Sequence, residues 1–264
     1  MELRFKINKY YLLAHALKSE HPPFNGWVNL PNKLWEISND AYFFLFNPSS
    51  HDIIFTKIEN DKDFDIFLNT ITKDSDKIIA TAFKSEEFAR LYKETRKYME
   101  SIEKEWNNKR INITKIVEEI TGEKLSDIKI DVLITHPKLC NGMALPNSDT
   151  ICWGHKENWD NYSMVYLMHE TLHLILDKKL GKNNLTHAII ELIADQELRI
   201  RLNKNGIYFK ESKEGVGHPF LIKLSKVLLP YWKKYLKIKD KNIANFYLEM
   251  KNLSKIKKFL ELKK

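Results

Sequence analysis

The sequence has few of the residues and patterns that mark several classes of protein. Its 264 residues include two cysteines, Cys140 and Cys152, which is too few for a disulfide framework. It has eight glycines and eight prolines, and 43% of its residues are hydrophobic, which excludes a disordered or fibrous chain. No uncharged apolar run is long enough to span a bilayer. The sequence therefore indicates a soluble, globular and helix-rich protein with no membrane segment.

The first residues also argue against export. The stretch from Met1 to Ile7 carries charged residues among its apolar ones, unlike the uncharged centre of a signal peptide. We therefore expect a cytoplasmic protein in which both cysteines stay reduced.

The positive charge of the chain is concentrated near its C-terminal end. Residues 221–264 contain 13 lysines, three acidic residues and no arginine. Such a segment can attract nucleic acid or an acidic protein. Its lysines, however, are interleaved with apolar residues at helical spacing, which favours a solvated helix face. Arginine, the preferred residue for bidentate contacts to phosphates and bases, is missing. Nucleic acid is therefore an open but disfavoured partner.

The apolar pattern divides the chain into three parts. Residues 1–127 are predicted to be a mostly helical region whose role the sequence does not reveal. Residues 128–218 are predicted to contain a small antiparallel or mixed sheet followed by two helices. Residues 219–264 are predicted to form two or three lysine-rich helices, broken near Pro230 and Asp240, that pack on the central part. The predicted fold class is thus α+β and predominantly helical.

Individual elements follow from periodicity and from capping residues. Ser85 is predicted to open a long helix, and Gly122 and Gly181 are predicted to stop helices. The predicted helices cover residues 7–18, 33–46, 85–107, 111–121, 162–179 and 185–203. The predicted strands cover residues 128–135, 143–145 and 150–153.

The most informative pattern is H-E-x-x-H, formed by His169, Glu170 and His173. Two histidines four residues apart lie on the same face of a helix, so their imidazole rings can converge on one Zn²⁺ ion. Glu170 is rotated by about 100° from its neighbour, which places it beside the metal. Glu191 follows His173 by 18 positions, and Asp195 comes four residues later on the same predicted helix.

These residues predict a division of roles. His169, His173 and Glu191 are the predicted zinc ligands, and three protein ligands leave the open position that marks a catalytic site. Glu170 is the predicted general base, which takes a proton from a metal-activated water molecule and passes it to the leaving amine. Asp195 is predicted to accept a hydrogen bond from the second ring nitrogen of His169. His187, one turn before Glu191, stays open as an alternative third ligand or as a residue that supports the site.

H-E-x-x-H followed by E-x-x-x-D resembles the gluzincins, the zinc metallopeptidase superfamily that includes thermolysin. The resemblance covers residues from about 130 to 200 and implies that residues 128–218 form a zincin-like catalytic core. It also implies that an edge strand holds the backbone of the peptide substrate. The expected counterpart of that strand is Met143, Ala144 and Leu145, or alternatively residues 150–153. The family further suggests a residue that stabilises the oxyanion, for which His218 is the first candidate and Tyr208 the second.

Related families fit less well or stay open. Metzincins require glycine and histidine where this chain has Leu176 and Lys179, so that assignment fails. The zinc aminopeptidases carry a glutamate in a G-x-M-E-N strand that the stretch 141–145 lacks, which argues mildly against them. The regulatory metallopeptidases of the ImmA/IrrE type have E-x-x-A-N on the following helix, close to the E-x-x-A-D at 191–195, and they stay open.

The sequence therefore predicts a zinc-dependent peptidase with a peptide or protein substrate, and an endopeptidase rather than an aminopeptidase. The alternative is an ImmA/IrrE-like regulatory metallopeptidase, or a regulator that binds nucleic acid or protein through its flanking parts and uses the zincin domain as a sensor or scaffold. A peptidase inhibited by one of its own flanking helices is a third hypothesis. No pattern in the sequence indicates an oligomeric state.

Overall fold

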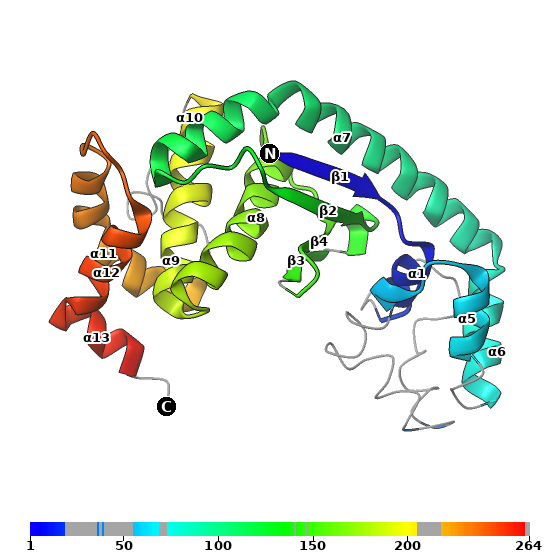
Figure 1. Ribbon diagram of the computed structural model, residues 1–264. Coiled ribbons are helices and arrows are strands. Elements are labelled where there is room, and N and C mark those ends of the chain that lie inside the picture. The colour runs from blue at the N-terminus through cyan, green and yellow to red at the C-terminus, as the bar shows by residue number, and fades with distance from the viewer. Residues whose placement is uncertain are drawn as a thin grey trace.

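A computed structural model describes most of the chain. It covers residues 1–18, 55–68, 73–139, 141–145, 147–204 and 218–261, together with the single residues Glu36 and Asn39. Within these residues the protein is predominantly helical with one small sheet, which confirms the predicted class (Figure 1). Cys140, Tyr208 and nearly all of the predicted helix at 33–46 lie outside the described residues.

The sheet is mixed and has four strands in the order β1-β2-β4-β3. The pairs β1/β2 and β2/β4 are parallel, whereas β3 pairs with β4 in the antiparallel direction. This order leaves β3 at one edge of the sheet and places β4 in the interior. All five residues of β4 are buried, including Cys152. The strands are β1 Glu2–Lys6, β2 Lys129–Ile134, β3 Asn141–Leu145 and β4 Thr150–Gly154.

Strand β1 is an element that the sequence analysis did not predict at the start of the mostly helical first part. Its residues alternate between exposed polar side chains and less exposed apolar ones, with Leu3 buried. Arg4 and Lys6 both pair with Asp131 on β2, at 2.6 and 2.8 Å. Arg4 and Lys6, two of the charged residues that argue against a signal peptide, therefore hold β1 against Asp131, which lies more than 120 residues away in the sequence.

The helices of the first part build a second hydrophobic cluster, together with Leu133 of β2 and Cys152 of β4. Tyr10 and Phe64 of this cluster and the half-buried Phe83 packed against it have ring centroids 4.8 to 5.6 Å apart. The predicted helix at 7–18 is observed as α1 Lys9–Lys18. The other elements are the 3-10 helix Phe55–Lys57, α5 Asp61–Leu68 and α6 Lys73–Phe83.

Helix α7, Glu86–Thr121, is one continuous helix of 36 residues, so the prediction of two helices broken near residue 108 was wrong. Its ends are as predicted: the side chain of Ser85 accepts a hydrogen bond from the backbone N–H of Phe88, and Gly122 ends it with φ of 73°. Trp106 and Ile113 are buried on both sides of the expected break, so packing outweighs the weak helix propensity there. Figure 1 shows α7 extending over the sheet and on to α6.

Helices α8 and α9 form the pair that carries the motif. The turn between them begins at Gly181, which ends α8 with φ of 86° as predicted. Asn183 then caps α9, because its side chain accepts hydrogen bonds from the backbone N–H groups of Leu185 and Thr186. The predicted helix at 185–203 is a continuous helical run whose middle is a π-helix. The elements are α8 Tyr162–Leu180, α9 Asn184–Glu191, the π-helix Leu192–Leu198 and α10 Arg199–Asn203.

The C-terminal helices pack on α9 and share its hydrophobic core, with Trp232 fully buried. The predicted break near Asp240 is present, but the one near Pro230 is not. Pro230 lies exposed inside α11, whose opposite side buries Leu228 and Leu229, and this packing carries the helix through. None of the described helices is long and apolar enough to cross a membrane. The elements are the 3-10 helix Pro219–Leu221, α11 Ile222–Tyr235, α12 Ile243–Asn252 and α13 Ser254–Glu261.

Candidate metal centre

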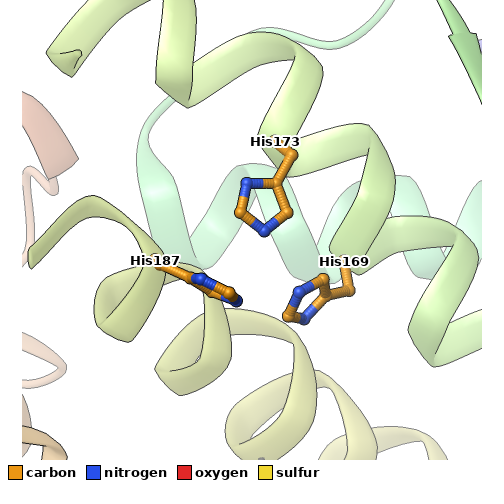
Figure 2. Close-up of side chains that lie close together, drawn as sticks. All are labelled: His169, His173 and His187. Carbon is orange, nitrogen blue, oxygen red and sulfur yellow. The ribbon is translucent and has the colours of Figure 1, made fainter. Parts of the chain in front are cut away.

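Three histidines converge where α8 and α9 lie side by side. His169 and His173 come from α8, and His187 comes from α9. One ring nitrogen from each can be chosen so that the three nitrogens lie within 4.8 Å of one another. Figure 2 shows the three rings turned toward one shared space. Nitrogen donors at this spacing suit a transition metal such as zinc.

His169 is buried and is held by a carboxylate. Its Nδ1 lies 2.9 Å from Oδ1 of Asp195, which is the contact expected from the sequence. Because an ionised carboxylate only accepts hydrogen bonds, Nδ1 carries the proton and Nε2 is left to face the cluster. Burial alone would lower the pKa of His169, but Asp195 and the nearby carboxylates of two glutamates raise it to about 9. The same negative field that favours a proton favours a metal cation.

His173 is oriented in the same way by a residue that the sequence analysis missed. Its Nδ1 lies 3.0 Å from Oδ2 of Asp177, one turn further along α8. The signal was present, because an aspartate four residues after a histidine lies on the same helix face. Both motif histidines therefore have one nitrogen fixed by a carboxylate and the other free for an ion.

His187 completes the group. Its ring centroid is 4.6 Å from that of His173 and 5.5 Å from that of His169. Its Nε2 is buried and has no hydrogen-bond partner among the described residues. Burial and the neighbouring histidines lower the pKa of His187 to about 3, so the ring is neutral. A neutral imidazole with an unpaired nitrogen is the form that binds a metal.

Glu191 belongs to a second, overlapping group. Its Oε1 accepts hydrogen bonds from the backbone N–H of His218 at 2.7 Å and from Nδ1 of the same residue at 2.8 Å. Donor atoms of His187, Glu191 and His218 also lie within 4.8 Å of one another. Glu191 is 2% exposed, and its Oε2 has no partner among the described residues. The set of His169, His173 and Glu191 inferred from the sequence stays a prediction, because the described residues group Glu191 with His187 and His218.

The remaining predicted residues lie around this cluster. Glu170 is half-buried on α8, and its charge helps to raise the pKa of His169. Strand β3 lies beside α8 at the edge of the sheet, and its Met143, Ala144 and Leu145 are half-buried. The alternative edge strand at 150–153 is wrong, because β4 is paired on both sides. Tyr208, the second oxyanion candidate, is outside the described residues.

Aromatic side chains that carried no signal in the sequence border the centre. The half-buried ring of Tyr166 lies 5.9 Å from that of His169 and stacks on Trp153 at 6.3 Å. Phe220 is 56% exposed, and its ring lies 5.4 Å from that of His218. Only the spacing of Tyr166, one turn before His169, could have pointed to it.

Comparisons with protein-family models, with curated proteins and with solved structures gave no match to this chain. Its likeness to the gluzincins therefore rests on the motif residues alone.

Proposed function

We propose that this protein is a zinc-dependent peptidase and that the histidine cluster between α8 and α9 is its catalytic centre. The observation that carries the proposal is the convergence of His169, His173 and His187, with the two motif histidines held by carboxylates. Nitrogen ligands backed by carboxylates are the usual make-up of a zinc centre in proteins. The buried, unpaired Nε2 of His187 and Oε2 of Glu191 are further donors that fit an ion.

The residues of the chain have separate tasks in this proposal. His169 and His173 hold the ion together with a third donor from α9. When bound there, zinc supplies a Lewis acid that polarises a carbonyl group and lowers the pKa of water. Glu170, half-buried beside His169, takes a proton at its carboxylate and returns it to the nitrogen of the leaving amine. Asp195 and Asp177 hold the two imidazoles in the required tautomer and orientation.

The proposed substrate is an extended peptide, and the cleavage is internal. Strand β3 is an edge strand beside the motif helix, so a peptide can pair with it by strand addition. Such pairing recognises the backbone of any extended segment and needs no free terminus. Tyr166 beside His169 and Phe220 beside His187 offer apolar surface next to the cluster.

Glu170→Gln tests the proposal. The variant keeps the shape of the side chain but cannot accept a proton, so zinc content stays stoichiometric while peptide cleavage falls by about 10²-fold to 10⁴-fold. Cleavage is measured on a mixture of unstructured fluorogenic peptides, and zinc by elemental analysis. Glu100→Gln, at an exposed position of α7, is the control and keeps full activity. Purified protein without stoichiometric zinc, or undiminished cleavage by Glu170→Gln, refutes the proposal.

A second candidate function is a regulator that binds nucleic acid. Lys223, Lys226 and Lys234 are exposed and lie on one side of α11 at about 100° per residue, and Lys237 lies exposed just beyond the end of this helix. A stripe of this kind binds a polyanion with an affinity that falls steeply with salt. Retention on immobilised DNA or RNA at 0.1 M salt that is lost in Lys226→Glu/Lys234→Glu supports this function, and no retention excludes it.

A further inference from the structure

The two donor groups in the cluster share one residue, and that residue is His187. The sequence pattern instead favoured Glu191, one turn later on α9. Both side chains have a buried atom without a hydrogen-bond partner among the described residues, Nε2 of His187 and Oε2 of Glu191. Burying such an atom is unfavourable unless a ligand binds it. The question is which of the two atoms binds the metal.

The geometry favours His187. Its nitrogen can lie within 4.8 Å of the nitrogens of both His169 and His173, and its ring is the nearest to that of His173 among the described ring contacts. Glu191 approaches the cluster from the side of His218, with which it shares two hydrogen bonds. One of these comes from a backbone N–H, so a move of Glu191 toward the motif histidines would also release the chain at His218.

We propose that His187 is the third metal ligand and that Glu191 is a positioning residue that holds His218 beside the centre. This inference rests on the proposed metal-dependent function and specifies its ligands. Glu191 fixes both the backbone and the ring of His218, whose centroid lies 4.4 Å from that of His187. His218 is thereby kept beside the centre, where its Nε2 can form a hydrogen bond with a reacting substrate. The centre then consists of three imidazole ligands, and Glu191 acts on it only through His218.

The test compares two substitutions in the full-length chain. Zinc affinity is measured by competition with a chromophoric chelator, and the ligand set by the visible absorption spectrum of the Co²⁺-loaded protein. His187→Asn weakens zinc binding by about 100-fold or more. This is at or above the largest loss that is usual when a residue that only supports a ligand is replaced. Glu191→Gln keeps zinc affinity within about tenfold and leaves the Co²⁺ spectrum unchanged. His136→Gln, a histidine outside the cluster, is the matched control.

A second measurement tests the positioning role of Glu191. In Glu191→Ala the hydrogen-bonded Nδ1–H signal of His218 disappears from ¹H–¹⁵N imidazole spectra, whereas Glu191→Gln, which keeps an oxygen acceptor, retains it. Circular dichroism establishes that each variant is folded, and His187→Ala serves if His187→Asn is not. Loss of zinc in Glu191→Gln, or retention of zinc in His187→Asn, overturns the inference and leaves the peptidase proposal intact. A wild-type protein that binds no zinc refutes the peptidase proposal itself.

Discussion

Carboxylates hold buried histidine rings in two regions of this protein, but the carboxylate is buried in one region and exposed in the other. In the candidate metal centre, the side chains of His169 and Asp195 are 3% and 1% exposed. Beyond the end of β2, His136 is paired with Glu94 at 3.2 Å, and their side chains are 7% and 51% exposed. Water can replace Glu94 as a partner of its histidine, whereas nothing outside the protein can replace Asp195.

This difference suggests that the buried carboxylate fixes the orientation of its histidine ring, whereas the exposed one does not. Removing two charged groups from water costs several kcal/mol per ion, so a fully buried pair is a poor source of stability. A pair with one exposed partner costs little and contributes little. The burial of Asp195 is therefore best understood as a way to fix the direction of the His169 ring. Three predictions use this contrast.

The largest effect is expected from breaking the buried pair. His169→Ala leaves the carboxylate of Asp195 buried without its partner, which lowers the free energy of unfolding by about 3 kcal/mol. The loss is measured by urea denaturation of the metal-free protein. Replacing both residues in His169→Ala/Asp195→Ala restores part of it, since no unpaired charge remains. Equal stability of the wild type and His169→Ala would show that Asp195 has another partner.

An intermediate effect is expected on zinc affinity when the carboxylate that holds a motif histidine is replaced by an uncharged amide and the histidine itself is kept. Asp195→Asn weakens zinc binding by about 100-fold and Asp177→Asn by about tenfold, the two ends of the range for supporting residues. Asp195 has the larger effect because it is 1% exposed and Asp177 is 7% exposed. Chelator competition measures both. The reverse order would mean that burial does not determine the strength of these contacts.

The smallest effect is expected at His136. Burial lowers the pKa of His136, and the exposed Glu94 offsets this only in part. Its folded pKa therefore lies below the unfolded value of about 6.5, and the unfolded chain takes up the proton more readily. Stability falls as the pH drops below about 6.5, and His136→Gln shows a shallower fall. Urea denaturation at pH 7.5 and pH 5.5 compares the two proteins; identical slopes would contradict the prediction.

The parts of the fold that the sequence predicted are those with local causes. The ends of α7 and α8 follow from Ser85, Gly122 and Gly181, whose caps act within one turn. Strands β2 to β4 follow from alternating or β-branched residues next to turn residues. Strand β1 and the continuity of α7 could not be predicted, because both depend on partners far away in the sequence. Asp131 holds β1, and core packing carries α7 across its polar middle.

The candidate site also has contacts that local sequence spacing predicts and contacts that depend on distant partners. His169 and His173 are placed by one helix, so their spacing alone brings them together. The contact between Asp195 and His169 follows from two antiparallel helices joined by a short turn. The contact of Glu191 with His218 spans 27 residues, and no local pattern relates the two. The role of His187 was open in the sequence because one helix face offered two donors, and we infer the choice between them from the packing of α9 on α8.

Helix α7 has a consequence for how the molecule unfolds. Its 36 residues make it about 54 Å long at the usual rise per residue. Phe88 and Leu91 near its start belong to the N-terminal hydrophobic cluster, and Trp106 and Ile113 belong to the cluster around the histidines. A helix this polar depends on packing for its stability. Unfolding of the N-terminal hydrophobic cluster therefore removes the packing that supports the first half of α7. Amide hydrogen exchange should therefore be faster in the half of α7 that packs on the first cluster than in the half that packs on the cluster around the histidines.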